Sequence, residues 1–179
     1  GKTEWKVDRP KRVSWSTPTL AIDGNAETLY LSSNGIAEAY DFASGKQLWQ
    51  LDELEGNTVA SPTITEQFVI IGSSAPDNTM ALLRENKLKG PDRIAWKAED
   101  GSSSFGSPLA TDEHLYLVNR AGVATCHEIK TGKKLWNLRL PGSCWASPLS
   151  AGDRIYFFTK EGTTIVLSAD GTSKILAEN

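Results

Sequence analysis

Few of the residues that build catalytic or metal sites are present in this chain. Its 179 residues contain two cysteines, two histidines and one methionine. The two cysteines, Cys126 and Cys144, do not make a disulfide framework, and they leave the cellular compartment open. Apolar runs are also short. None reaches the roughly eighteen residues of a membrane-spanning helix, so we expect a protein that is not membrane-spanning.

The charge balance gives no electrostatic reason to expect a nucleic-acid partner. The chain has 19 basic and 22 acidic residues, for a formal net charge of −3. Binding to phosphates needs a clustered basic surface. The two short basic runs, at residues 6–12 and 87–93, each contain an aspartate. We therefore interpret both runs as solvated loops and predict no nucleic-acid binding.

What the chain does contain is an internal repeat. Tryptophans at positions 5, 49, 96 and 136 are spaced by 44, 47 and 40 residues. Prolines at positions 18, 62, 108 and 148 are spaced by 44, 46 and 40 residues, in phase with the tryptophans. Two periodic series in phase indicate repeated structural units. We place these units at about residues 13–51, 57–98, 103–140 and 143–177, within a single region spanning 1–179.

Each unit contains short runs of β-forming residues separated by turn signals such as Asp23-Gly24 and Asn34-Gly35. No run of helical period extends beyond about two turns. Four strands in a unit of this length predict a β-propeller blade. We therefore predict an all-β propeller of four-stranded antiparallel blades, with about four blades in this chain. The clearest expected strands are Thr28–Ser32, Gln67–Gly72, His114–Val118 and Arg154–Thr159.

The run AYDFASGKQLW, from Ala39 to Trp49, resembles the tryptophan-docking motif of pyrroloquinoline quinone (PQQ)-type propeller repeats. That family includes the quinoprotein alcohol dehydrogenases and the propeller lipoprotein of the outer-membrane barrel assembly machinery. The resemblance covers nearly the whole chain, and it implies that each tryptophan docks between neighbouring blades. The residues for which we expect this structural role are Trp5, Trp49, Trp96, Trp136, Gly45 and Gly132.

The motif changes from unit to unit. The second unit stretches it to sixteen residues by an insertion around residues 86–92, and the third has Cys126 in place of the small alanine. The fourth unit has Val166, Gly171 and Leu176, so its docking contact should be weaker because the tryptophan is replaced.

The arrangement of the repeats bears on whether the ring is complete. The chain begins at Gly1, without a methionine or an apolar leader, which indicates a mature or trimmed form. Residues 3–7 match the closing strand of a preceding blade. We therefore expect part of a ring of about seven or eight blades, or a half-ring completed by missing blades or by self-association with a second copy. A self-contained four-bladed ring is the alternative.

The triplet Cys126-His127-Glu128 has the residue types of a nucleophilic or zinc site. A strand places successive side chains on opposite faces, so Cys126 and Glu128 would point away from His127. In the repeat, Cys126 takes the position of Ala39 and Glu128 that of Asp41. We therefore interpret the triplet as structural and predict no catalytic, metal-binding or cofactor-binding residue in the chain.

An aromatic column is a better candidate for binding. The same position in each unit, shortly before the repeated proline, is occupied by Trp15, Val59, Phe105 and Trp145. The resemblance implies that the first strand of each blade lines the central channel. These aromatic residues could then form a ring at the channel mouth, suited to a peptide or a sugar. Packing between blades is the alternative.

The function that we expect from the sequence is a non-catalytic binding or scaffolding propeller with a protein or peptide partner. The resemblance implies a bacterial, extracytoplasmic protein, periplasmic or secreted, with no cofactor. One alternative is part of a PQQ-dependent quinoprotein oxidoreductase, with PQQ and calcium, although the adjacent cysteine pair frequent in those enzymes is missing from the sequence. A glycan-binding propeller is a second alternative.

Overall fold

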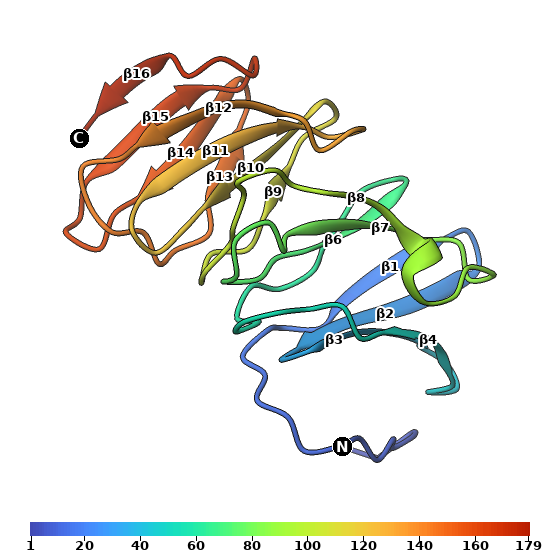
Figure 1. Ribbon diagram of the computed structural model, residues 1–179. Helices are drawn as coiled ribbons and strands as arrows, with labels where there is room; N and C mark the ends of the chain where they lie inside the picture. The colour runs from blue at the N-terminus through green and yellow to red at the C-terminus, as the bar shows by residue number, and fades with distance from the viewer.

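Each repeat forms one antiparallel sheet of four strands in the computed structural model, which describes residues 1–179 (Figure 1). The strands of every sheet pair in chain order, so the predicted all-β fold of four-stranded blades is confirmed. Blade 1 contains β1 (Thr19–Asp23), β2 (Ala26–Ser33), β3 (Ile36–Asp41) and β4 (Gln47–Leu51). Blade 2 contains β5 (Thr63–Ile64), β6 (Phe68–Ile71), β7 (Met80–Leu83) and β8 (Ile94–Lys97). Blade 3 contains β9 (Leu109–Ala110), β10 (His114–Val118), β11 (Val123–Glu128) and β12 (Lys134–Arg139). Blade 4 contains β13 (Leu149–Ala151), β14 (Arg154–Phe158), β15 (Thr164–Ser168) and β16 (Ile175–Glu178).

Tight hairpins join the strands where the sequence has glycine after Asp or Asn. Gly24 and Gly35 have φ angles of 60° and 89°, in the left-handed region that glycine adopts without strain. The single helical element is a short 3-10 turn, η1 (Gly90–Arg93), inside the insertion of blade 2. No helix of the structure has the length and hydropathy needed to cross a bilayer.

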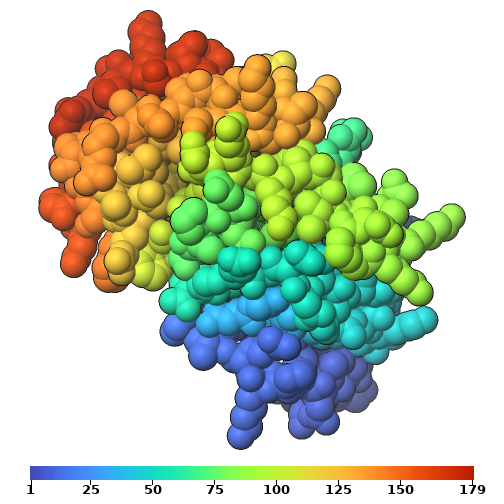
Figure 2. Space-filling view, viewed as in Figure 1, coloured from blue at the N-terminus to red at the C-terminus, as the bar shows by residue number.

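Three apolar clusters hold the blades together, and each is built from the facing sides of two consecutive sheets. The first joins blades 1 and 2 through residues such as Trp49 and Val69, and the second joins blades 2 and 3 through Trp96 and Leu115. The third joins blades 3 and 4 through Tyr116 and Phe157. None of the three joins blade 4 to blade 1. The four blades therefore form an open arc, from blue blade 1 to red blade 4 (Figures 1 and 2).

A ladder of hydrogen bonds connects the inner strands at their starts. The Thr17 N–H donates to Ser61 Oγ at 2.8 Å, and the Ser61 N–H donates to Ser107 Oγ at 3.0 Å. The Ser107 N–H continues the ladder to Ser147 Oγ at 2.8 Å. The hydroxyl column beside the repeated prolines thus fixes the height of each blade against the next.

The docking tryptophans lie against neighbouring blades in two ways. The rings of Trp5 and Trp96 lie over Gly45 and Gly132, where an added Cβ atom would be 2.6 and 2.5 Å from the ring. Trp136 instead donates its indole N–H to the Gly171 carbonyl at 2.8 Å, and Trp5 donates to the Phe42 carbonyl at 2.8 Å. Each ring thus contacts a glycine or a backbone carbonyl outside its own strand, and a docking role for these residues stays a prediction. Their contribution to stability stays a prediction.

Trp49 has a different partner, which the insertion of blade 2 supplies. The Arg93 guanidinium carbon lies 4.2 Å from the centroid of the Trp49 ring, and the Arg93 side chain is buried. Its two terminal nitrogens donate to the carbonyls of Leu83 and Leu88. The stretched motif therefore replaces a glycine contact with a cation stacked on the indole face.

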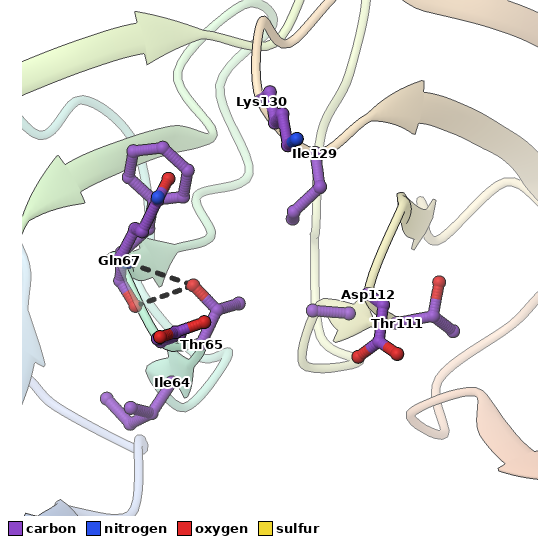
Figure 3. Close-up of a pocket in the computed structure, with 10 residues that line it drawn as sticks. Ile64, Thr65, Gln67, Thr111, Asp112, Ile129 and Lys130 are labelled. Carbon is purple, nitrogen blue, oxygen red and sulfur yellow. Dashed lines mark hydrogen bonds between the residues drawn. The ribbon is translucent and has the colours of Figure 1, made fainter.

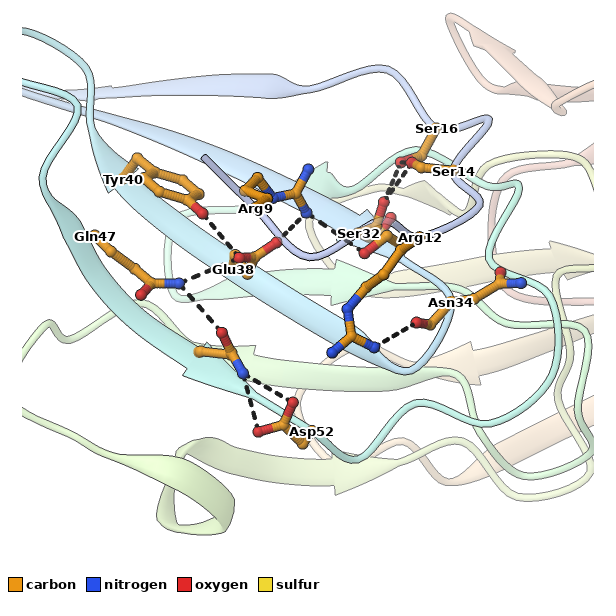
Figure 4. A network of polar contacts seen from close by, with 12 residues as sticks. Arg9, Arg12, Ser14, Ser16, Ser32, Asn34, Glu38, Tyr40, Gln47 and Asp52 are labelled. Atoms are coloured by element: carbon orange, nitrogen blue, oxygen red, sulfur yellow. Dashed lines mark hydrogen bonds and ion pairs between the residues drawn. The ribbon is translucent and has the colours of Figure 1, made fainter. Parts of the chain in front are cut away.

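The N-terminal segment, residues 1–16, crosses blade 1 without forming a strand (Figure 4). Arg9 forms an ion pair with Glu38, whose carboxylate also accepts the Tyr40 hydroxyl at 2.8 Å. Burial and this hydrogen bond raise the pKa of Tyr40 to about 12. The expected closing strand at residues 3–7 makes no ladder here, and its pairing stays a prediction.

We predict that Trp49→Ala and Trp136→Ala each lower the free energy of unfolding by about 3–5 kcal/mol, because each truncates an aromatic side chain that packs between two blades. Urea unfolding followed by circular dichroism measures the loss. The matched control is Trp15→Ala, since the Trp15 side chain is 61% exposed and should tolerate truncation. Losses equal to that of the control would contradict a docking role.

Candidate functional site

Two exposed tryptophans, Trp15 and Trp145, lie in the segments that precede the first strands of blades 1 and 4. Trp15 and Trp145 are 61% and 52% exposed, so neither ring is buried between blades, although Trp145 before β13 contacts Phe105 of the preceding blade. The half-buried Phe105 ring lies 5.0 Å from Trp145 at an angle of 41°, and Lys160 Nζ lies 4.9 Å from the centroid of Trp145. We call Phe105, Trp145 and Lys160 the aromatic patch.

The backbone around Trp145 explains why its ring points outward. Cys144 is buried in the joint between blades 3 and 4 and forms an isolated bridge with Thr159. The Lys160 N–H donates to the Ser143 carbonyl at 2.7 Å, which holds the lysine beside the indole. Gly106 lies against the Ala146 carbonyl, where an added Cβ would be 2.6 Å away. The missing side chain at Gly106 thus allows the two aromatic residues to meet.

This arrangement combines an apolar surface with one cation. Two tilted rings offer an apolar surface for an aromatic or aliphatic side chain or for the face of a sugar. The Lys160 ammonium beside them can pair with a carboxylate. Trp15 belongs to the same column on blade 1, at the other end of the ladder of hydroxyls.

A second concave surface lies at the opposite end of blades 2 and 3 (Figure 3). It is a cleft of about 450 Å³ between two equivalent hairpin turns, with Ile64 and Ile129 as apolar lining. Thr65 and Thr111 begin these turns, and each hydroxyl accepts the N–H of the residue three positions later, at 2.9 and 3.1 Å. Sequence reasoning missed this cleft. Its signal was the repeated Thr-x-x-Phe and Thr-x-x-His at the start of two strands.

The structure places the Cys-His-Glu triplet as the strand alternation predicts. Cys126 lies in the core between blades 3 and 4, while His127 is buried on the other face of the sheet. The His127 ring nitrogens lie 3.0 Å from the Gly132 carbonyl and 3.0 Å from Thr125 Oγ1. Glu128 is exposed and accepts the Thr131 hydroxyl within the docking-motif turn. The three side chains do not converge on a site.

The residues present in these four blades suit neither metal binding nor thiol chemistry. The chain brings together no group of three or more His, Cys, Asp or Glu side chains that could hold a metal ion. A calcium ion needs several oxygen ligands, so the residues present do not fit the calcium of a quinoprotein centre. Burial raises the pKa of the Cys126 thiol to about 12 and also raises that of Cys144, so neither is a thiolate at neutral pH.

The open arc of four-stranded blades, with apolar joints and tryptophans seated on glycines, defines the chain as a β-propeller segment. A family profile described as "Outer membrane protein assembly factor BamB" matches residues 90–174. No curated protein sequence is similar enough to count as a match. The matched residues include all of blade 3, the first three strands of blade 4, and η1 and β8 of blade 2.

Solved structures share the fold at low identity. The computationally designed Ika4 protein is 15% identical with a TM-score of 0.71, and the alignment covers 94% of this chain and 98% of Ika4. BamB from Moraxella catarrhalis is 19% identical with a TM-score of 0.64, covering 89% of this chain and 50% of BamB. Quinohemoprotein alcohol dehydrogenase ADHIIG from Pseudomonas putida HK5 is 15% identical with a TM-score of 0.68, covering 94% of this chain and 34% of the enzyme.

These findings support a PQQ-like propeller repeat family, with the profile match in blades 3 and 4 and a shared fold over nearly the whole chain. The chain spans half the length of BamB and about a third of that of the dehydrogenase.

We predict that both thiols are inert in the folded protein. A thiol must be exposed and ionised to react with a disulfide reagent, and both side chains are buried with raised pKa values. Titration with Ellman's reagent at pH 8 should detect neither cysteine before denaturant is added and both afterwards. A control variant, Ser150→Cys, places a thiol at an exposed position and should react at once. Reaction of the unmodified chain at the rate of this control would contradict the prediction.

We predict a loss of stability on mild acidification that depends on His127. Burial lowers the pKa of His127 below its ordinary value near 6.5. The unfolded chain then binds the proton more readily, so the contribution of His127 is complete above about pH 6.5 and falls as the pH drops below it. The slope can reach about 1.4 kcal/mol per pH unit.

Urea midpoints measured between pH 7.5 and 5 test this, because that range lies above the ordinary pKa of carboxylates. His127→Gln should flatten the dependence on pH, whatever it does to stability at pH 7.5. The control His114→Gln removes the other histidine and should leave the dependence in place. Equal slopes in the two variants would show that His127 is not its source.

Proposed function

We propose that this chain is part of a non-catalytic propeller that binds a protein or peptide partner through the aromatic patch. The observation that carries the proposal is the exposed Trp145 ring, stacked on Phe105 and flanked by Lys160. Aromatic residues are enriched among those that dominate the free energy of protein association. Leaving such a ring in water, on a backbone fixed at Cys144 and Gly106, favours a role in binding over one in packing.

The resemblance of the repeats to BamB supports a scaffolding role and an extracytoplasmic compartment, periplasmic or secreted. The profile that matches residues 90–174 describes a protein that assembles other proteins. We infer a partner with an apolar or aromatic anchor and a nearby carboxylate, since the anchor would cover the two rings and the carboxylate would pair with Lys160.

Two alternatives remain distinct proposals. A quinoprotein oxidoreductase is favoured only by the fold shared with the dehydrogenase, since these four blades bring together no calcium-binding cluster. A glycan-binding propeller is favoured by the same exposed rings, because a tryptophan face also stacks on a sugar.

We predict that Trp15→Ala/Trp145→Ala loses peptide binding while keeping its fold. Peptides are first selected on the unmodified chain from a displayed random library, and their affinities are then measured by isothermal titration calorimetry. The double variant should bind at least about tenfold more weakly, with an unchanged melting temperature, because both rings are exposed. The control Leu135→Ala removes an exposed side chain of β12 and should keep full affinity.

The alternatives are separated by two further assays on the same proteins. A glycan array tests for sugar binding that Trp145→Ala abolishes, and a dye-linked assay with PQQ and calcium tests for dehydrogenase activity. Selected peptides that bind the double variant as tightly as the unmodified chain would refute the aromatic patch as the binding surface.

A further inference from the structure

Each end of the arc has a sheet face that no other blade covers. On blade 3, the cross-strand row Leu109, Tyr116, Cys126 and Trp136 packs onto blade 4. The row in the same register on blade 4 is Leu149, Tyr156, Val166 and Ala177, and no blade covers it. We call this side of blade 4 the trailing face.

Blade 1 presents the opposite kind of face. On blade 2, the row Ile64, Val69, Leu82 and Ile94 packs onto blade 1. The equivalent row on blade 1 is Leu20, Leu29, Tyr40 and Gln47, on the side turned away from blade 2. We call this side the leading face. The N-terminal segment covers the part of the leading face around Tyr40, which is 3% exposed and shares Glu38 as a partner with Arg9. The part of the leading face on β1 is open, since Leu20 and Ile22 are 39% and 65% exposed, and Leu149 on the trailing face is 55% exposed.

We infer that two copies of this chain join head to tail, with the trailing face of each copy against the leading face of the other. The resulting ring has eight blades and twofold symmetry. Both of its new joints repeat the internal pairing at the first two strands, and they include the N-terminal segment where it covers Tyr40 and Gly45. This inference does not depend on the proposed function, because it uses the faces of the sheets and not the aromatic patch.

The ladder of hydroxyls supports a second copy as the occupant. At one end, the exposed Ser147 has an N–H that donates to no acceptor in the chain. At the other end, the exposed Thr17 has a hydroxyl that takes no part in a hydrogen bond. In each internal joint, the N–H of this column donates to the hydroxyl of the next blade. Thr17 of a second copy is therefore the acceptor that Ser147 lacks.

The tryptophans support the same occupant. The strand register puts Ala177 of blade 4 at the position of Trp49, Trp96 and Trp136, so the sequence-based assignment of this position to Leu176 is wrong by one residue. Blade 4 therefore brings no docking ring to the next joint. The corresponding position on blade 1, at Gly45, is filled by Trp5 of the N-terminal segment. Each joint of the two-copy ring then has one tryptophan, with Trp5 at the two new joints beside the small side chain of Ala177.

Charge agrees with this pairing. Arg154 lies beside Tyr156 on the trailing face, where it also pairs with Asp153 at 3.7 Å, and Glu27 lies beside Leu29 on the leading face. Opposite charges therefore border the two rows near the first hairpin turns.

Sedimentation velocity and light scattering on the full chain test the inference. The unmodified chain should have twice the mass of one copy at micromolar concentrations. Leu149→Glu on the trailing face and Leu20→Glu on the leading face should each give a single copy, because each places a charge in both joints. The control Leu135→Glu adds the same charge to an exposed site of blade 3 and should leave the mass doubled. Circular dichroism should be identical for all variants, since the substituted side chains are exposed.

Mixing the two single-copy variants provides the decisive measurement. A mixed pair has one joint with no substitution and one joint with both, so a two-chain complex should return, with weaker affinity than the unmodified pair because the second joint no longer closes intramolecularly. A single copy at all concentrations of the unmodified chain would overturn the inference. A doubled mass for either single variant would also overturn it. If only Leu149→Glu gives the mass of one copy, the two chains pair through identical trailing faces and not head to tail.

Discussion

The structure depends on a property of each blade, which is apolar on both of its faces. A four-stranded sheet with one wet face can be stable beside a single partner, but these sheets alternate so that both sides carry rows such as Thr19–Tyr30–Ala39–Trp49 and Leu20–Leu29–Tyr40. Burial of such rows is favourable at about 25 cal/mol per Å² of apolar surface, so each sheet is stabilised by a neighbour on either side. The three apolar clusters satisfy this requirement inside the arc. No blade covers the two end faces, although the N-terminal segment buries Tyr40 on the end face of blade 1.

The repeats differ in the group that contacts the indole ring of their repeated tryptophan. Trp96 lies on a glycine, Trp136 donates to a carbonyl, and Trp49 lies under a buried guanidinium. Burying the Arg93 charge is tolerated because two carbonyl oxygens accept its N–H groups and the indole face supplies electron density. The insertion of blade 2 is therefore part of the joint between blades 1 and 2, since its Arg93 contacts Trp49 of blade 1 and the Leu83 carbonyl of blade 2.

The fold could be predicted from the sequence because each period of the tryptophans and prolines corresponds to one four-stranded blade. The expected strand His114–Val118 agrees with β10 at both ends, and the position of Cys126 follows from the alternation along β11. What the sequence could not show depends on residues brought together across blades. Nothing near Arg93 in the sequence points to Trp49, and the exposure of Trp145 follows from the bridge between Cys144 and Thr159, outside any strand. The cleft beside Ile129 is a product of two hairpins from different blades.

The same constraint decides where a partner can bind. Because the faces of the sheets are used to join blades, the surfaces left for recognition are the strand ends and the loops between them. One end of the arc carries the ladder of hydroxyls and the aromatic patch, and the other carries the cleft between the turns at Thr65 and Thr111. Cys126 and His127 lie on sheet faces that pack against neighbouring blades. Burial there raises the pKa of the Cys126 thiol and lowers the pKa of His127, so both side chains are uncharged at neutral pH. Trp145 lies in a loop before β13 and is 52% exposed, so a partner of the proposed kind would reach its ring without any change in the packing of the sheets.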